Sequence, residues 1–121
     1  MNALLDSDVL LDFLDGFAPA ARELARYDDC SVSITSWMEV MAGARTALDE
    51  ETRRAFLTHF TVLPVTNEIA ERAVSLRREF RLKIPDAIIW ATARAAGYLL
   101  VSRNTKDFPK GQAGVRFPYR R

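Results

Sequence analysis

Cysteine and histidine are almost absent from this chain of 121 residues, which contains only Cys30 and His59. A single cysteine permits no internal disulfide, so we expect a reducing compartment. One histidine cannot build a histidine-based zinc site. A metal site in this protein would have to rely on oxygen ligands.

A charge imbalance and a membrane-length apolar run are also absent. The 17 basic and 16 acidic side chains leave a net charge of +1, which argues against a protein that coats nucleic acid by bulk charge. The longest apolar span, residues 87–101, contains Arg94 and Gly97 and falls short of a membrane helix. No secretory signal is visible, and we expect a cytoplasmic protein without membrane contact.

The composition is that of one globular domain. Glycine and proline number five each, 49% of the residues are hydrophobic and 27% are charged. A chain of this length buries roughly two-thirds of its unfolded surface around a single core and has no room for a second domain. We therefore expect one domain over residues 1–121.

Short, often β-branched apolar runs alternate with amphipathic runs along the chain. The apolar runs predict strands over residues 2–5, 31–34, 61–65, 98–102 and 115–118. The amphipathic runs predict helices over residues 9–14, 20–27, 37–46, 50–60, 68–81 and 86–96. This alternation predicts an α/β fold with a central, mostly parallel sheet of four or five strands and helices on both faces.

The segment ALLDSDVLL, residues 3–11, places two carboxylates, Asp6 and Asp8, inside an otherwise apolar run. Unpaired buried charge is costly, so either a partner neutralises the pair or the run opens to a cleft. One of the two acids could simply cap the helix that follows. However, ligands of parallel sheets collect at the carboxyl ends of the strands, and Asp6 lies at such an end.

Two further acids lie near the starts of later helices. Glu39 follows the strand predicted over residues 31–34, although its spacing from Ser36 is also that of a capping box. Asp86 heads a helix that is apolar on nearly all sides, so we expect its carboxylate to be sheltered and to require a cation. A favourable contact with the helix dipole is the simpler interpretation of Asp86.

A fourth polar segment, SRNTKDF at residues 102–108, follows the next predicted strand and contains Asn104 and Asp107. A plain turn is the alternative interpretation. If the four segments converge, their carboxylates repel one another unless they hold a proton or a metal. Oxygen ligands alone favour Mg²⁺ or Mn²⁺, and activated water at such ions cleaves phosphodiesters.

Three stretches resemble motifs of the PIN-domain ribonucleases, and most closely of the VapC-type toxins of bacterial toxin–antitoxin pairs: LLDSDVLLDFL, SITSWMEVMAG and IPDAIIWATARAAGYLLVSRNTKDF. The similarity runs from residue 4 to residue 117. It implies a PIN fold, Mg²⁺- or Mn²⁺-dependent endoribonuclease activity on RNA, a cognate antitoxin and a homodimer. The metal ligands that it implies are Asp6, Glu39 and Asp86.

Two positions depart from the pattern of many relatives. Asp8 stands where many have Asn, which adds charge beside the site. Asn104 stands where many have Asp, and an amide can orient a water but cannot act as a base. Either Asp107 supplies the missing carboxylate or the site works with three acids. The expected catalytic set is Asp6, Glu39, Asp86, Asn104 and Asp107.

Two other functions are compatible with the same residues. Asp6-x-Asp8 after a strand also resembles the first motif of haloacid-dehalogenase-type phosphatases, in which Asp6 would be a nucleophile. The length of the chain and the lack of a clear downstream acidic pair disfavour it. The third hypothesis is a non-catalytic PIN-like binding module that uses the acids as caps.

Basic residues gather in two parts of the sequence. Most such charges are solvated helix faces, and the functional alternative is a rim that guides RNA phosphates without sequence choice. The residues are Arg72, Arg77, Arg78, Arg81 and Lys83 around one predicted helix, and Arg116, Arg120 and Arg121 at the end.

Overall fold

The five strands form one sheet in which every neighbouring pair is parallel. The computed structural model describes residues 1–121 and gives the strand order β3-β2-β1-β4-β5. The strands are β1 (Asn2–Leu5), β2 (Asp29–Ser33), β3 (Thr61–Leu63), β4 (Leu99–Val101) and β5 (Val115–Arg116). The predicted α/β fold is confirmed, although β5 is shorter than the run predicted over residues 115–118.

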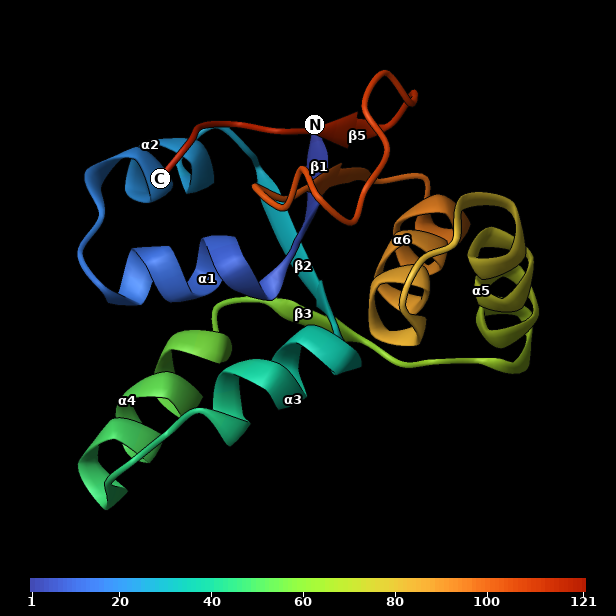
Figure 1. The fold of residues 1–121 in the computed structure, drawn as a ribbon. Helices are drawn as coiled ribbons and strands as arrows, with labels where there is room; N and C mark the ends of the chain where they lie inside the picture. The colour runs from blue at the N-terminus through green and yellow to red at the C-terminus, as the bar shows by residue number, and fades with distance from the viewer.

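Six helices cover the two faces of the sheet, as predicted (Figure 1). Helices α5 and α6 lie against each other on one side, while α1, α3 and α4 lie on the other. Their bounds are α1 (Ser7–Leu14), α2 (Ala18–Leu24), α3 (Ile34–Ala42), α4 (Ala47–Leu57), α5 (Asn67–Phe80) and α6 (Ile84–Ala96). No helix has the length and apolar character needed to cross a membrane.

Strand β1 is the centre of the sheet and contributes to the core on both of its faces. Because successive strand residues point to opposite sides, Leu4 joins the core under α5 and α6, and Ala3 and Leu5 join the core under α1, α3 and α4. All three side chains are fully buried. The continuous apolar run at the start of the chain is therefore a consequence of a strand covered on both faces.

The helix ends follow the local chemistry of the chain. Pro19 and Pro85 lie in the first turns of α2 and α6, where a missing N–H costs nothing. Gly97 ends α6 in the left-handed conformation, with φ of 72°. The sequence favours Asn67, directly before Glu68 and Ile69, as the cap of α5. That prediction is wrong: Thr66 is the cap, its hydroxyl accepts from the amide of Ile69, and Asn67 is the first helical residue.

The direction in which strands are added to the sheet reverses between β1 and β4. The chain adds β2 and β3 on one side of β1 and then returns through α5 and α6 to add β4 and β5 on the other side. The backbone amide of Asp6 donates to the carbonyl of Val101 at 2.9 Å, so the two strands end together. Parallel sheets bind their ligands at such a reversal of strand order.

Helix α4 packs against the core that lies under α1, α3 and α4, and this packing can be tested directly. Leu57 is 2% exposed and packs with the sheet, whereas Leu48 on the same helix is 73% exposed. We expect Leu57→Ala to lower the free energy of unfolding by about 2–4 kcal/mol, because it leaves a cavity. Leu48→Ala is the matched control and should change it by less than about 0.5 kcal/mol in urea denaturation. Equal effects would contradict the described docking of α4.

Candidate active site

A cavity of about 240 Å³ opens where β1 and β4 end. The structure places all five residues of the expected catalytic set on this one cavity, although they come from four separate segments of the chain. Its lining also includes residues that were not in that set. The complete lining is Asp6, Ser7, Asp8, Glu39, Lys83, Pro85, Asp86, Asn104 and Asp107.

Asp6 both caps a helix and faces the cavity, so the two interpretations of this residue hold together. One carboxylate oxygen accepts from the amide of Ser7 at 2.8 Å, and the other accepts from the Ser102 hydroxyl at 2.7 Å. The side chain is buried, with 4% exposed. Burial and then the neighbouring charge of Asp8 raise the pKa of Asp6 to about 8. The fold therefore holds a carboxyl group that resists ionisation unless a cation is near.

Asp8 lies beside Asp6 and lacks a full set of partners. Its Oδ2 is 3.4 Å from the Ser102 hydroxyl, and its Oδ1 is buried with no hydrogen-bond partner. Burial raises the pKa of Asp8, and the charge of Arg103 opposes that shift. A buried carboxylate oxygen without a partner is an available ligand for a cation or for a hydrogen-bond donor.

Ser102 joins the two strand ends and was not identified from the sequence. Its hydroxyl donates to Asp6 and accepts from the backbone amide of Asn104 at 3.0 Å. It is completely buried directly after β4. The available signal was its place as the first polar residue after a buried strand, which is the same signal that identified Asp6.

Glu39 is not part of a capping box, so that interpretation is wrong. Helix α3 begins earlier than predicted, at Ile34, and Ser33 is its cap, accepting from the amide of Thr35 at 3.1 Å. Ser36 is therefore inside the helix and cannot bond the helix-start amides. The carboxylate of Glu39 instead accepts from the Ser7 hydroxyl at 3.2 Å, which directs it toward α1 and the cavity.

Asp86 and Lys83 come from the start of α6. Asp86 is half-buried, and burial followed by the charges of Asp107 and Glu39 raises its pKa to about 6, while Lys83 opposes the shift. Lys83 is the single cationic residue on the cavity and makes no ion pair. In the sequence Lys83 is one of several basic residues around a predicted helix, whereas in the structure it lines the same cavity as the acids.

Asn104 and Asp107 are bonded to each other in the loop after β4. The Asn104 side-chain amide donates to Asp107 Oδ2 at 2.8 Å, and its Oδ1 accepts from the Asp107 backbone amide at 3.3 Å. The departure at Asn104 therefore has a local consequence. Its amide fixes the orientation of the Asp107 carboxylate, and both side chains line the cavity.

The cavity thus carries five carboxylates and one ammonium group, all from residues that line it. No three of the acidic side chains are grouped closely enough to form a ready metal site. The set nevertheless fits a hard divalent ion in its chemistry: every acidic ligand atom is oxygen, Asp8 Oδ1 has no partner, and the pKa values of Asp6 and Asp86 are raised. A bound cation would offset the burial and the charge repulsion that raise these pKa values.

Comparison with known proteins decides the family. The model of the PIN domain matches residues 3–112 of the chain. Ribonuclease VapC10 of Mycobacterium tuberculosis is 37% identical over 114 residues, which cover 88% of this chain and 85% of that protein. The chain belongs to the PIN-domain family. Within this family it is a ribonuclease of the VapC type, as the three sequence motifs had indicated.

Two solved structures share nearly the whole fold of the chain. A toxin–antitoxin complex from Klebsiella pneumoniae contains a chain that is 42% identical, with a TM-score of 0.91 and coverage of 97% of this chain and 98% of that one. VapBC2 from Rickettsia felis, bound to a DNA fragment from its promoter, matches with 19% identity and a TM-score of 0.72 over 95% and 96% of the chains. Membership of the PIN-domain family removes the phosphatase alternative.

The raised pKa of Asp6 predicts a pH-dependent stability. The pKa of about 8 in the folded state exceeds the ordinary Asp value of about 4, so the folded state binds this proton more tightly than the unfolded state. The stabilisation is complete below about pH 4 and is lost as the pH rises through about 8. Asp86 acts in the same direction with its pKa of about 6. Metal-free protein should therefore lose stability in urea between about pH 5 and about pH 9.

Asp6→Asn isolates this effect, because an amide stays neutral and can still bond Ser7 and Ser102. We expect it to stabilise the protein by at least about 1 kcal/mol at high pH and to flatten the pH dependence. Asp29→Asn, an exposed change at the opposite end of β2, is the control and should leave the wild-type dependence intact. A wild-type dependence that persists in Asp6→Asn would contradict the assignment.

Proposed function

We propose that this PIN-domain ribonuclease is a Mg²⁺- or Mn²⁺-dependent endoribonuclease that hydrolyses RNA phosphodiester bonds and serves as the toxin of a toxin–antitoxin pair. The observation that carries the proposal is the single cavity lined by Asp6, Asp8, Glu39, Asp86 and Asp107 at the carboxyl ends of β1 and β4. A cavity with this negative charge repels RNA unless a cation is present. A cation is also needed to activate the water that cleaves the phosphodiester bond.

Asp6, Glu39 and Asp86 are the residues that would hold the ion. Asp8 lines the same cavity and has a buried oxygen without a partner, which makes this carboxylate a further candidate ligand. When bound, Mg²⁺ or Mn²⁺ supplies charge neutralisation and lowers the pKa of water for attack on phosphorus. The raised pKa values of Asp6 and Asp86 support this assignment, because a nearby cation would favour the ionised carboxylates that burial and neighbouring charges disfavour.

The remaining residues orient these groups. Ser102 holds one oxygen of Asp6 and Ser7 holds Glu39, so two of the acids have fixed directions. Asn104 bonds Asp107, whose carboxylate would accept a proton from the attacking water. The ammonium group of Lys83 is free to contact a phosphate oxygen of the substrate.

A cognate antitoxin and a homodimer belong to the same proposal. The antitoxin is supported by the likeness to a chain of the Klebsiella pneumoniae toxin–antitoxin complex at 42% identity. A cytoplasmic location follows from an RNA substrate. The acidic cavity would be the natural surface for an antitoxin to cover, since any cationic side chain placed there would be stabilised by the carboxylates.

The catalytic assignment predicts that Asp6→Asn abolishes cleavage. We expect purified, antitoxin-free protein to cut total cellular RNA into discrete fragments in Mg²⁺ or Mn²⁺ and not in EDTA, with the rate reduced about 100-fold or more in Asp6→Asn and in Asp86→Asn. Asp29→Asn is the matched control and should cleave at the wild-type rate. Full activity of folded Asp6→Asn would contradict the mechanism.

Metal binding can be measured without any cleavage. Mn²⁺ at about 100 times its Kd should raise the free energy of unfolding of wild-type protein by about 2.7 kcal/mol. Asp6→Asn and Asp86→Asn should lose most of this increase, and Asp29→Asn should retain it. If neither ion stabilises the wild-type protein and no RNA is cut, the non-catalytic binding module becomes the better description.

A further inference from the structure

A second pocket, of about 580 Å³, lies beside the acidic cavity and has the opposite charge. We call it the basic pocket. It is lined by no acidic residue and by two kinds of side chain that suit nucleic acid, cations and aromatic rings. The cations are Arg103, Lys110, Arg120 and Arg121, and the rings are Phe117 and Tyr119.

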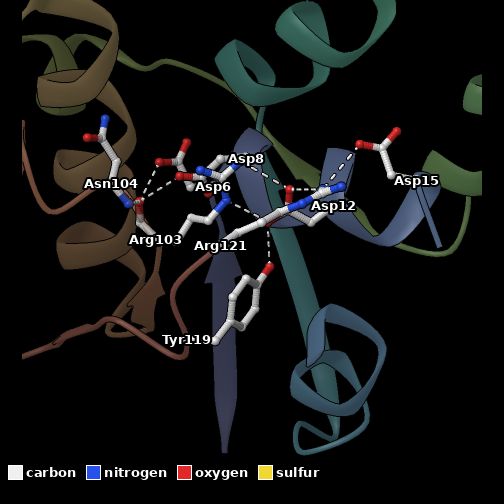
Figure 2. Close-up of polar contacts among 9 residues, drawn as sticks. Asp6, Asp8, Asp12, Asp15, Arg103, Asn104, Tyr119 and Arg121 are labelled. Atoms are coloured by element: carbon white, nitrogen blue, oxygen red, sulfur yellow. Dashed lines mark hydrogen bonds and ion pairs between the residues drawn. The ribbon is translucent and has the colours of Figure 1, made fainter. Parts of the chain in front are cut away.

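The basic pocket and the acidic cavity are lined by neighbouring residues of one stretch of backbone. Arg103 lines the pocket and stands between Ser102, which bonds Asp6, and Asn104, which lines the acidic cavity. Figure 2 shows Arg103 lying between the Asp6 and Asp8 carboxylates on one side and Asp12 with Arg121 on the other. A polyanion that reaches the acids therefore has a positive surface directly next to it.

Asp12 holds the cationic wall of this pocket in place. It is 1% exposed, and its carboxylate accepts two hydrogen bonds from Arg103, at 2.6 and 3.1 Å, and one from Arg121 at 2.7 Å. The Tyr119 hydroxyl adds a fourth at 2.8 Å. The C-terminal residues are thus fixed to α1. The second guanidinium NH₂ group of each arginine has no hydrogen-bond partner within the protein, so each arginine keeps one NH₂ group, with two N–H donors, for an anion.

Lys110 and Arg120 make no polar contact that would stabilise the fold. Both are exposed and neither forms an ion pair, in contrast to Arg116, which is paired with the buried carboxylate of Glu23. Asp12 and Asp15 offset part of the charge of Arg103 and Arg121. The pocket therefore keeps a net positive charge.

We propose that the basic pocket binds a phosphate and the adjoining nucleotide of single-stranded RNA, next to the bond that is cut. This rests on the proposed function and adds the place where the substrate strand is held. Arginine donors bind phosphate oxygens in a fixed geometry, and the half-buried rings of Phe117 and Tyr119 give a base a flat apolar surface. An acidic protein segment is the competing occupant: it could pair with the cations, but it carries no base to stack on the rings of Phe117 and Tyr119 that line the pocket.

The test removes the two unpaired cations. We expect K110Q/R120Q to bind a short fluorescein-labelled RNA of mixed sequence about 10-fold more weakly in EDTA, as measured by fluorescence anisotropy across a salt series. The slope of log K against log salt should fall by about 1.4, since each lost contact with a single strand contributes about 0.7. Both side chains are exposed, so the variant should melt like the wild type.

R45Q/R78Q is the charge-matched control, because Arg45 and Arg78 are exposed, form no ion pair and line neither pocket. It should bind RNA within about twofold of wild type. Equal losses in the two double variants would mean that the affinity is diffuse and would overturn the proposal. Wild-type affinity in K110Q/R120Q would also overturn it.

Two further arms separate this inference from the proposed function. If wild-type protein cleaves RNA and K110Q/R120Q binds and cleaves equally well, only the pocket assignment fails. If wild-type protein neither binds nor cleaves RNA, both fail. If a labelled oligoglutamate peptide binds the wild type and loses affinity in K110Q/R120Q while RNA binding is unchanged, the pocket belongs to an acidic protein segment, and the RNA assignment is overturned.

Discussion

Acidic side chains gathered at the ends of β1 and β4 repel one another, and the rest of the structure must hold them together against this repulsion. Two such charges about 4 Å apart repel by roughly 4 kcal/mol at an effective dielectric of 20. The fold holds Asp6 and Asp8 together all the same, with Ser102 bonded to Asp6 and a core on each face of β1. The energy that opposes this repulsion comes from apolar burial away from the site. A divalent ion bound among these acids would therefore stabilise their ionised forms.

The same constraint explains the division of the surface into two charged regions. Polyanionic RNA cannot approach five carboxylates by itself, and the protein carries a net charge of only +1. A local set of cations next to the acids therefore matters more than the overall charge. Arg103 stands at the boundary, and the buried carboxylate of Asp12 fixes its direction as well as that of Arg121. Cleavage and strand binding would then share one loop, residues 102–108.

Strand and helix positions were predictable because both faces of the sheet are covered. The apolar runs of β1 and β4, and the apolar residues on nearly all sides of α6, are easily recognised in the sequence because these elements are buried. Helix starts were less predictable, because several Ser, Thr and Asn residues near each start have similar capping chemistry. Ser33 rather than Ser36 caps α3, and Thr66 rather than Asn67 caps α5. The choice between neighbours depends on where each strand ends, which is a matter of pairing with other strands.

The amino-acid sequence by itself determined the class of fold, the reliance on oxygen ligands and the acids that lie at strand ends, since these follow from composition and from the periodicity of burial. The motifs of the PIN domain added the family. Only the tertiary structure decided that Ser102 links two strand ends, that Lys83 faces the acids and that Asp12 draws Arg103 and the C-terminal residues into one pocket. These contacts join residues that are far apart in the chain: Asp12 and Arg121 are 109 positions apart. No local pattern records such a pairing, because it exists only once the sheet has brought its strand ends together.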